Sequence, residues 1–355
     1  MALTDQTISV RDGEQLPADI IDSYLKAHLP ELQGTPRISQ FPGGASNLTY
    51  LLQYPDRELV LRRPPFGHKA RSAHDMAREY RILNQLNAGF AYCPKAYVHC
   101  TDESLIGAEF YVMQRVDGVI LRAELPPELQ LDRQQARALC MSFIDRLVEL
   151  HQVDYQACGL ADLGRPDGYV RRQIEGWSER YERARTPDAP AWEPIKAWLN
   201  DKLPADHPRA AIIHNDYRFD NVILDPANPL RIIGVLDWEM TTLGDPLMDL
   251  GNTLAYWIEA NDPPSMQVMR RQPSHLPGML TRAEFVDYYA ERAGISVPCF
   301  DFYYVYGLFR LAGIVQQIYF RFHHGQTRDQ RFARFVELNR LLERRALDVI
   351  EASTL

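Results

Sequence analysis

The sequence predicts an α+β fold in two parts: a small antiparallel sheet with one main helix, and a larger part that is mostly helical. Short runs typical of strands dominate the first third of the chain, and apolar residues at helical spacing dominate the rest. The dipeptide Asp117-Gly118 is typical of a turn at the border between them. We therefore predict one domain over residues 1–115 and another over residues 116–355.

The first part is expected to form a sheet. The stretch Ile38–Tyr54 predicts two short strands around a turn at Gly43-Gly44, and Glu58–Arg62 predicts a third strand. Apolar residues at helical spacing then predict a helix over Ser72–Leu86, and Glu109–Val116 predicts a further strand. Strands joined by short turns pair in antiparallel fashion, which gives the expected sheet.

The second part is expected to begin with a helix from about Arg133 to His151, whose apolar residues recur at helical spacing. Short strands are predicted around a polar loop, at Ala211–Ile213, Val222–Leu224 and Ile232–Leu236. After Pro246 the pattern is helical almost to the end of the chain.

The composition narrows the class of protein. The chain has 355 residues with 46% hydrophobic content, enough for a sizeable core, and a net charge of −8 argues against a surface that coats nucleic acid. The first residues do not look like a secretory signal, and no run of 18 apolar residues occurs, so a cytoplasmic protein without a membrane partner is expected. Five cysteines without Cys-x-x-Cys spacing argue against a disulfide framework or a zinc site.

The stretch 212–224, IIHNDYRFDNVIL, places polar residues between two apolar ends. Buried carboxylates are costly unless they are paired or bind a ligand. If the two strands after this loop form a hairpin, Asp216, Asn221 and Asp237 come within reach of one another. Amide and carboxylate oxygens suit Mg²⁺, and Asp216 would then be available to accept a proton from an alcohol.

The segment His214–Asn221 resembles the H-x-D-x-x-x-x-N catalytic loop of the aminoglycoside phosphotransferase and choline kinase-like family, which is related to protein kinases. Asp237-Trp238-Glu239 resembles the counterpart of the kinase Asp-Phe-Gly motif. The resemblance implies a protein-kinase-like two-lobe fold that uses ATP and Mg²⁺. In that reading Asp216 is the catalytic base, and Asn221 and Asp237 hold the metal.

A purely structural reading of the same residues stays open: His214 and Asp216 could form a hydrogen-bonded pair in a turn that Asn221 caps. For His214 alone, bracing of the loop is the expected role. Asp245 and Asp249 are expected to cap and anchor the helix that follows, and the family resemblance implies that Asp249 also supports the catalytic loop.

The resemblance also implies a nucleotide site in the first part. Gly43, Gly44, Ser46 and Asn47 occupy the position of the phosphate loop but lack the G-x-G-x-x-G pattern, so a plain hairpin turn is an equal alternative.

Arg62 stands where protein kinases have a lysine, and Glu79 on the next helix is its expected partner; the alternative is an ordinary surface ion pair. The backbone of Gln114 to Val116 would hold the adenine.

The resemblance extends over most of the chain to the subgroup that is fused to, or encoded beside, acyl-CoA dehydrogenases. We therefore expect a small-molecule phosphotransferase that acts on a hydroxyl, with an anionic or acyl-CoA-like acceptor. Arginine outnumbers acidic residues in 164–185 and in 321–345, which favours an anionic acceptor unless these are simply solvated helix faces. A protein kinase is disfavoured because no Ala-Pro-Glu follows Asp237. A non-catalytic nucleotide-binding module is the remaining alternative.

Overall fold

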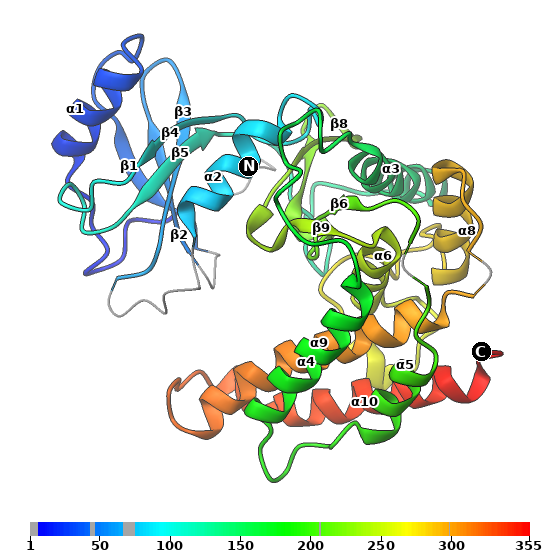
Figure 1. The fold of residues 1–355 in the computed structure, drawn as a ribbon. Coiled ribbons are helices and arrows are strands. Elements are labelled where there is room, and N and C mark those ends of the chain that lie inside the picture. The colour runs from blue at the N-terminus through cyan, green and yellow to red at the C-terminus, as the bar shows by residue number, and fades with distance from the viewer. Residues whose placement is uncertain (1–5, 43–46, 67–74, 206, 298) are drawn as a thin grey trace. The chain divides into compact units, whose positions relative to one another are not determined.

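The structure is a computed structural model that describes residues 6–42, 47–66, 75–205, 207–297 and 299–355. Internal contacts divide the chain into two compact units (Figure 1). Unit 1 comprises Met1–Ile120, Asp154–Leu160 and Val222–Glu239, and unit 2 comprises the rest. The lobe boundary after residue 115 stays a prediction, and two later segments of the chain belong to the first unit.

Unit 1 is built on a five-stranded antiparallel sheet. Its strands follow the order β1 (Arg37–Gln40), β2 (Leu48–Gln53), β3 (Glu58–Arg63), β5 (Phe110–Gln114) and β4 (Ala96–Cys100). The predicted strands are present, and β4 is an addition that pairs with β5. The order places β3 in the centre, where it pairs on both sides.

The helices α1 (Ala18–His28) and α2 (Met76–Leu86) cover opposite faces of this sheet (Figure 1). Successive residues of a strand point to opposite faces. Accordingly Leu59 and Leu61 join the apolar core beneath α1, whereas Arg62 reaches Glu79 of α2. The expected start of α2 at Ser72 lies outside the described residues; the N-cap is Asp75, whose side chain accepts from Arg78 N.

Unit 1 also contains a hairpin from later in the chain. β7 (Val222–Asp225) pairs with β8 (Asn228–Val235), as the sequence predicts, and Val119 forms a bridge to Leu224. The short helix η2 (Trp238–Met240) follows β8. The hairpin therefore carries Asp237 at the end of its second strand.

Unit 2 is mostly helical. The predicted helix α3 (Arg133–Gln152) is present, and Asp132 and Gln135 form a capping box at its start. A two-stranded sheet pairs β6 (Ala211–Ile213) with β9 (Thr242–Gly244). The remaining elements are α4 (Tyr169–Ala184), α5 (Glu193–Asp201), η1 (Phe219–Asn221), α6 (Pro246–Ala255), α7 (Pro264–Gln267), α8 (Arg282–Ala293), α9 (Asp301–His323), η3 (Gln330–Arg334) and α10 (Phe335–Ala352).

The long helix α9 organises unit 2 because it packs against α4, α6 and α10 (Figure 1). Glycines allow α6 and α9 to approach closely: a Cβ atom at Gly307 would overlap the carbonyl oxygen of Gly251, and one at Gly251 would overlap that of Tyr303. Within the described ranges, every helix is too short or too polar to cross a bilayer. The five cysteines are free thiols.

This close approach predicts a specific stability defect. Gly307→Ala should lower the free energy of unfolding by about 1–3 kcal/mol, because the added methyl group forces α6 and α9 apart. Gly176→Ala in α4 is the matched control, since the nearest atom to its added Cβ is the Arg180 Nη1 at 3.4 Å. There alanine should be neutral or stabilising by up to about 1 kcal/mol. Denaturant unfolding of both variants checks this, and equal effects would contradict the packing argument.

Candidate active site

The loop after β6 in unit 2 is held by one buried carboxylate. Asp249 of α6 accepts hydrogen bonds from the backbone N–H groups of His214, at 2.7 Å, and Asn215, at 2.7 Å. The Asp249 side chain is 0% exposed, so these bonds form away from water. Asp249 supports the loop, as the family resemblance implies, while Asp245 caps α6 by accepting from Leu247 N at 2.8 Å.

A histidine completes the environment of Asp249. His151 Nε2 lies 3.0 Å from Asp249 Oδ2, and His151 Nδ1 lies 2.7 Å from the Tyr289 hydroxyl. Burial alone would raise the pKa of Asp249, but the hydrogen bonds and charge of His151 and the loop amides outweigh it and hold the pKa below its usual range. The anchor of the loop is therefore an ionised carboxylate near neutral pH.

Asp216 is oriented by neighbours from the same loop. Its backbone N–H donates to His214 Nδ1 at 3.2 Å, which is the bracing role expected for His214. The Asn221 amide nitrogen donates to the Asp216 carbonyl oxygen at 2.9 Å and to its carboxylate Oδ2 at 3.0 Å. The Asp216 side chain remains 21% exposed, in contrast to Asp249. The carboxylate is thus held in place and still accessible.

The structure reveals one further residue of this loop that the sequence analysis does not single out. Arg218 Nε lies 2.9 Å from Asp216 Oδ1, and its Nη2 donates to Asp216 Oδ2 at 3.1 Å. Its Nη1 lies 3.1 Å from Asp220 Oδ2, and the guanidinium stacks on the Tyr256 ring at 4.6 Å. One arginine therefore joins two carboxylates.

The electrostatics of this group follow from burial and pairing. Burial alone would lower the pKa of Arg218, but Asp216 and then Tyr256 and Asp220 raise it above its usual value. Burial raises the pKa of Asp220, although Arg218 opposes that shift. The alternation of charges in Asp216-x-Arg218-x-Asp220 is the sequence signal that points to such a group.

Unit 1 holds a second polar group. Arg62 Nη1 lies 2.6 Å from Glu79 Oε1, and its Nη2 lies 3.2 Å from Asp237 Oδ1 and 3.8 Å from Glu239 Oε2. The predicted Arg62–Glu79 pair is present, and Glu79 is only 2% exposed, so it is not an ordinary surface pair. Burial alone would lower the pKa of Arg62, but its carboxylate neighbours raise it above the usual value.

Two of the expected nucleotide contacts already have partners in unit 1. The buried Asn47 side chain donates to Glu239 Oε2 at 3.2 Å. The Gln114 N–H donates to the Lys95 carbonyl at 2.8 Å, so an adenine contact through that N–H would have to break this bond. Val116 is half-buried. The other predicted loop residues, Gly43, Gly44 and Ser46, lie outside the described residues.

Each of the two polar groups contains or adjoins a residue with an unusual backbone conformation. In the described part of the chain, three residues other than glycine have positive φ: Asn215 at 65°, Asp237 at 68° and Trp192 at 60°. Such values are uncommon and tend to occur where the surrounding structure enforces them. Asn215 adjoins Asp216, and its side chain donates to the Met240 carbonyl at 3.0 Å. The hydrogen bonds of Asn215 therefore hold the strained turn that precedes the Asp216 carboxylate.

The sheet with its Arg62–Glu79 pair and the helical unit with its H-x-D-x-x-x-x-N loop define a phosphotransferase of protein-kinase-like fold. A family model described as the phosphotransferase enzyme family matches residues 37–294. The chain belongs to this family.

Curated relatives are longer than this chain. It is 33% identical over 360 residues to acyl-CoA dehydrogenase family member 11 of Gallus gallus, covering 98% of this chain and 45% of the relative. It is 36% identical over 325 residues to family member 10 of Mus musculus, covering 90% of this chain and 30% of the relative. The chain therefore spans less than half the length of these relatives.

Solved structures share the fold. A Ralstonia eutropha protein classed as an aminoglycoside phosphotransferase has a TM-score of 0.82 and 29% identity, covering 96% of this chain and 100% of that one. Macrolide 2′-phosphotransferase type I has a TM-score of 0.57 and 18% identity, with 94% and 97% covered. A mutant aminoglycoside phosphotransferase solved with ADP and hygromycin B has a TM-score of 0.58 and 14% identity, with 94% and 99% covered.

The Arg218 geometry predicts coupling between charges. Arg218→Met should lower the free energy of unfolding by about 1–3 kcal/mol, because Asp216 and Asp220 then lie close together without their cation. Adding Asp220→Asn to that variant should restore part of the loss, whereas Asp220→Asn alone should destabilise. Thermal unfolding of the four proteins measures the coupling. Strictly additive effects would show that Arg218 does not join the two carboxylates.

Proposed function

We propose that this protein transfers the γ-phosphate of ATP to a hydroxyl group of a small molecule, with Asp216 as the general base. The observation that carries the proposal is the Asp216 carboxylate, which Arg218 and Asn221 orient and which stays partly exposed. The acceptor hydroxyl gives its proton to Asp216 while its oxygen attacks the γ-phosphorus. The bond from that phosphorus to the bridging oxygen breaks, and ADP leaves.

Asn221 and Asp237 are the proposed ligands of Mg²⁺. The amide nitrogen of Asn221 is turned toward Asp216, which leaves its oxygen Oδ1 as the donor for a cation. Asp237 contacts Arg62 through Oδ1, so its other carboxylate oxygen can serve the same purpose. Both are hard oxygen donors of the kind that Mg²⁺ prefers. When bound, the ion would neutralise charge on the phosphates.

Arg62 is the proposed phosphate contact of the nucleotide site. Glu79 holds its guanidinium from the helix side, and this buried pairing fixes its direction. We extend the proposal to the loop of Gly43, Gly44, Ser46 and Asn47 around the phosphates.

The backbone of Gln114–Val116 is the proposed adenine contact, through groups other than the Gln114 N–H, which donates to the Lys95 carbonyl.

For the acceptor we propose an anionic molecule with a hydroxyl group, such as a hydroxylated acyl-CoA. The support is the similarity to proteins named acyl-CoA dehydrogenase family members, which are long enough to contain further domains. The arginine-rich segment 164–185 gives less support than its composition suggests. Arg172 donates to the backbone carbonyls of Arg165 and Asp167, and Arg180 lies over the Trp177 ring at 4.9 Å.

Replacement of the base tests the reaction. Asp216→Asn should leave nucleotide binding nearly intact and lower turnover by roughly 10² to 10⁴, the usual contribution of a general base. The measurement is phosphate transfer from labelled ATP across a panel of hydroxylated acyl-CoAs, sugars and amino alcohols. Turnover within threefold of the unmodified protein would remove Asp216 as the base. ATP binding without transfer to any acceptor would favour the alternative, a non-catalytic nucleotide-binding module.

The metal assignment has a test of its own. Asp237→Ala should weaken ATP binding in the presence of Mg²⁺ more than in its absence, because the proposed carboxylate ligand is gone. Calorimetric titrations with and without Mg²⁺ give the comparison. Glu239→Gln is the matched control, since it also removes a carboxylate charge within 4 Å of Arg62. Equal Mg²⁺ dependence in both variants would contradict the role of Asp237.

A further inference from the structure

Unit 2 contains a basic surface pocket that the phosphotransferase motifs do not use. This pocket has a volume of about 560 Å³ and lies between α10, the end of η3 and the segment around α7. Five guanidinium groups line it, from Arg271, Arg331, Arg334, Arg340 and Arg344, against the single carboxylate of Glu337. We call it the basic pocket. Such a gathering of positive charge is unexpected on a chain with a net charge of −8.

Three of these arginines have no carboxylate partner within 4.0 Å among the residues that the structure describes: Arg271, Arg344 and Arg340, the last of which donates to the Asp188 carbonyl at 2.6 Å. Arg331 is held by a forked pair with the half-buried Asp329, at 2.5 to 3.0 Å, whereas Arg334 has only the exposed Glu337, at 3.2 Å. Exposed pairs contribute little and exchange readily for another anion. The pocket therefore presents guanidinium groups that an added anion can engage.

The floor of the basic pocket is apolar. Phe335, Leu338 and Leu341 of α10 are half-buried there, and Val268 at the rim is 77% exposed. An exposed valine beside apolar side chains offers surface that a ligand can remove from water. The combination suits an amphiphilic anion better than an inorganic ion alone.

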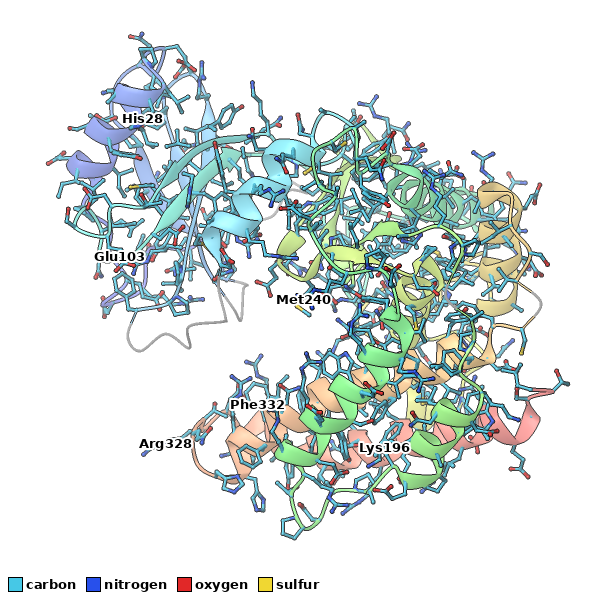
Figure 2. The ribbon with its side chains drawn as sticks, viewed as in Figure 1. His28, Glu103, Lys196, Met240, Arg328 and Phe332 are labelled. Atoms are coloured by element: carbon cyan, nitrogen blue, oxygen red, sulfur yellow. The ribbon has the colours of Figure 1, made fainter. Side chains whose placement is uncertain are left out.

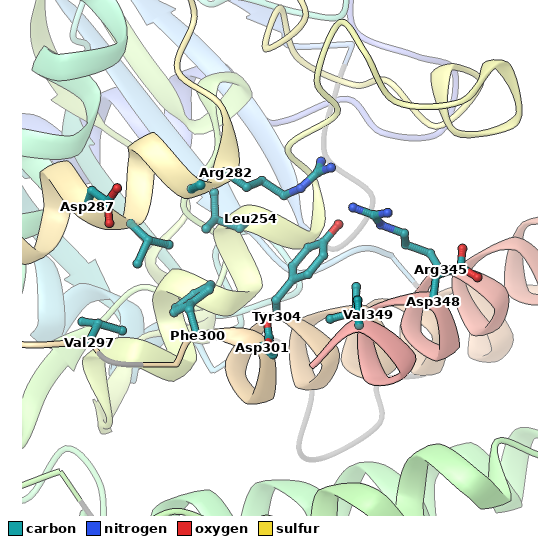
Figure 3. Close-up of a pocket in the computed structure, with 13 residues that line it drawn as sticks. Leu254, Arg282, Asp287, Val297, Phe300, Asp301, Tyr304, Arg345, Asp348 and Val349 are labelled. Atoms are coloured by element: carbon teal, nitrogen blue, oxygen red, sulfur yellow. The ribbon is translucent and has the colours of Figure 1, made fainter. Parts of the chain in front are cut away.

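A second pocket of unit 2 shows the contrast. It has a volume of about 430 Å³ and also contains two arginines, Arg282 and Arg345, on either side of the Tyr304 hydroxyl (Figure 3). There Arg282 is held by Asp262 at 2.6 Å and by Glu259 at 3.3 Å, and Arg345 lies 4.0 Å from Asp262. The positive charge in that pocket is largely neutralised from within the chain, so it does not call for an anionic ligand.

We propose that the basic pocket binds a small molecule carrying at least two phosphate groups beside an apolar body. Guanidinium groups match phosphate oxygens in forked pairs, and Arg271 and Arg344, together with the loosely paired Arg334, provide for more than one phosphate. The volume lies in the range of small-molecule sites. The proposal does not depend on the acceptor proposed above, because the lining residues differ from those of the reaction.

The test compares two soluble probes by calorimetry on the unmodified protein, and the matched variants below distinguish binding in the basic pocket from binding in the proposed nucleotide site. Inorganic pyrophosphate carries only the charge, whereas geranyl diphosphate adds an apolar body. Geranyl diphosphate should bind more tightly, and the affinity for both should fall as salt is raised. If neither probe binds, the proposal is overturned.

Matched variants locate the site. The double variant Arg271→Gln/Arg344→Gln should lower the affinity for both probes by about tenfold or more, which is the low end for the loss of charge-assisted contacts. Arg321→Gln with Arg328→Gln is the control: it also removes two exposed arginines from this end of unit 2, and Arg328 lies at the turn between α9 and η3 (Figure 2). The control should change affinity by less than about twofold. Equal losses in both double variants would show a diffuse charge effect and overturn the assigned site.

Two more measurements complete the test. Val268→Ser should weaken geranyl diphosphate and leave pyrophosphate unchanged, because it alters only the apolar rim. Unchanged affinity for geranyl diphosphate would overturn the apolar part of the proposal. Sedimentation with vesicles of anionic lipid distinguishes a membrane surface from a soluble ligand. Binding to vesicles without binding of the soluble probes would overturn the small-molecule assignment.

Discussion

The buried carboxylate of Asp249 is the constraint on which the loop His214–Asn221 depends. A strand that ends in a tight loop leaves backbone N–H groups without partners in the strand ladder, and burying them unpaired would be costly. Asp249 accepts two such groups, at His214 and Asn215, and is itself held by His151. The positive φ of Asn215 is tolerated because these bonds outweigh the strain. The direction of Asp216 follows from that turn.

Unit 1 depends on a comparable contact around Arg62. Alternation along β3 sends Arg62 to the face that α2 covers, and helix geometry then presents Glu79 to it. The buried pair is stable because each charge has the other, while Asp237 and Glu239 add further negative charge at the exposed edge. The same guanidinium thus links the sheet, α2 and the end of β8 within this unit.

Much of this arrangement could be predicted from the sequence, because the relevant signals are local. Alternation predicts the strands and motif spacing predicts the loop, whereas the Arg62–Glu79 pair is implied by the family resemblance. Helix α1 was not predicted, although its buried residues Ile21 and Leu25 are four apart, because a single short stripe is a weak signal. β4 depends on its pairing with β5, which is a tertiary contact.

The partners of single side chains were harder to predict. Arg218 has the local charge pattern of a bridge, yet only the folded loop shows that it reaches both Asp216 and Asp220. Asn47 and Glu239 lie 192 positions apart in the chain, so no periodicity could pair them. Segments 321–345 and 164–185 are similarly rich in arginine. Only the folded structure shows that arginines of the first segment line a pocket, whereas Arg172 of the second donates to backbone carbonyls.

The polar group around Arg62 has a charge imbalance that bears on the chemistry. Around Arg62, one guanidinium faces three carboxylates, so this group carries more negative than positive charge. A nucleotide triphosphate is itself strongly anionic, and such surroundings would repel it without an added cation. The excess of carboxylates near Asp237 therefore favours binding of a nucleotide together with a metal ion over binding of the nucleotide alone. The positive charge of the metal ion is attracted by the same carboxylates that would repel the phosphates.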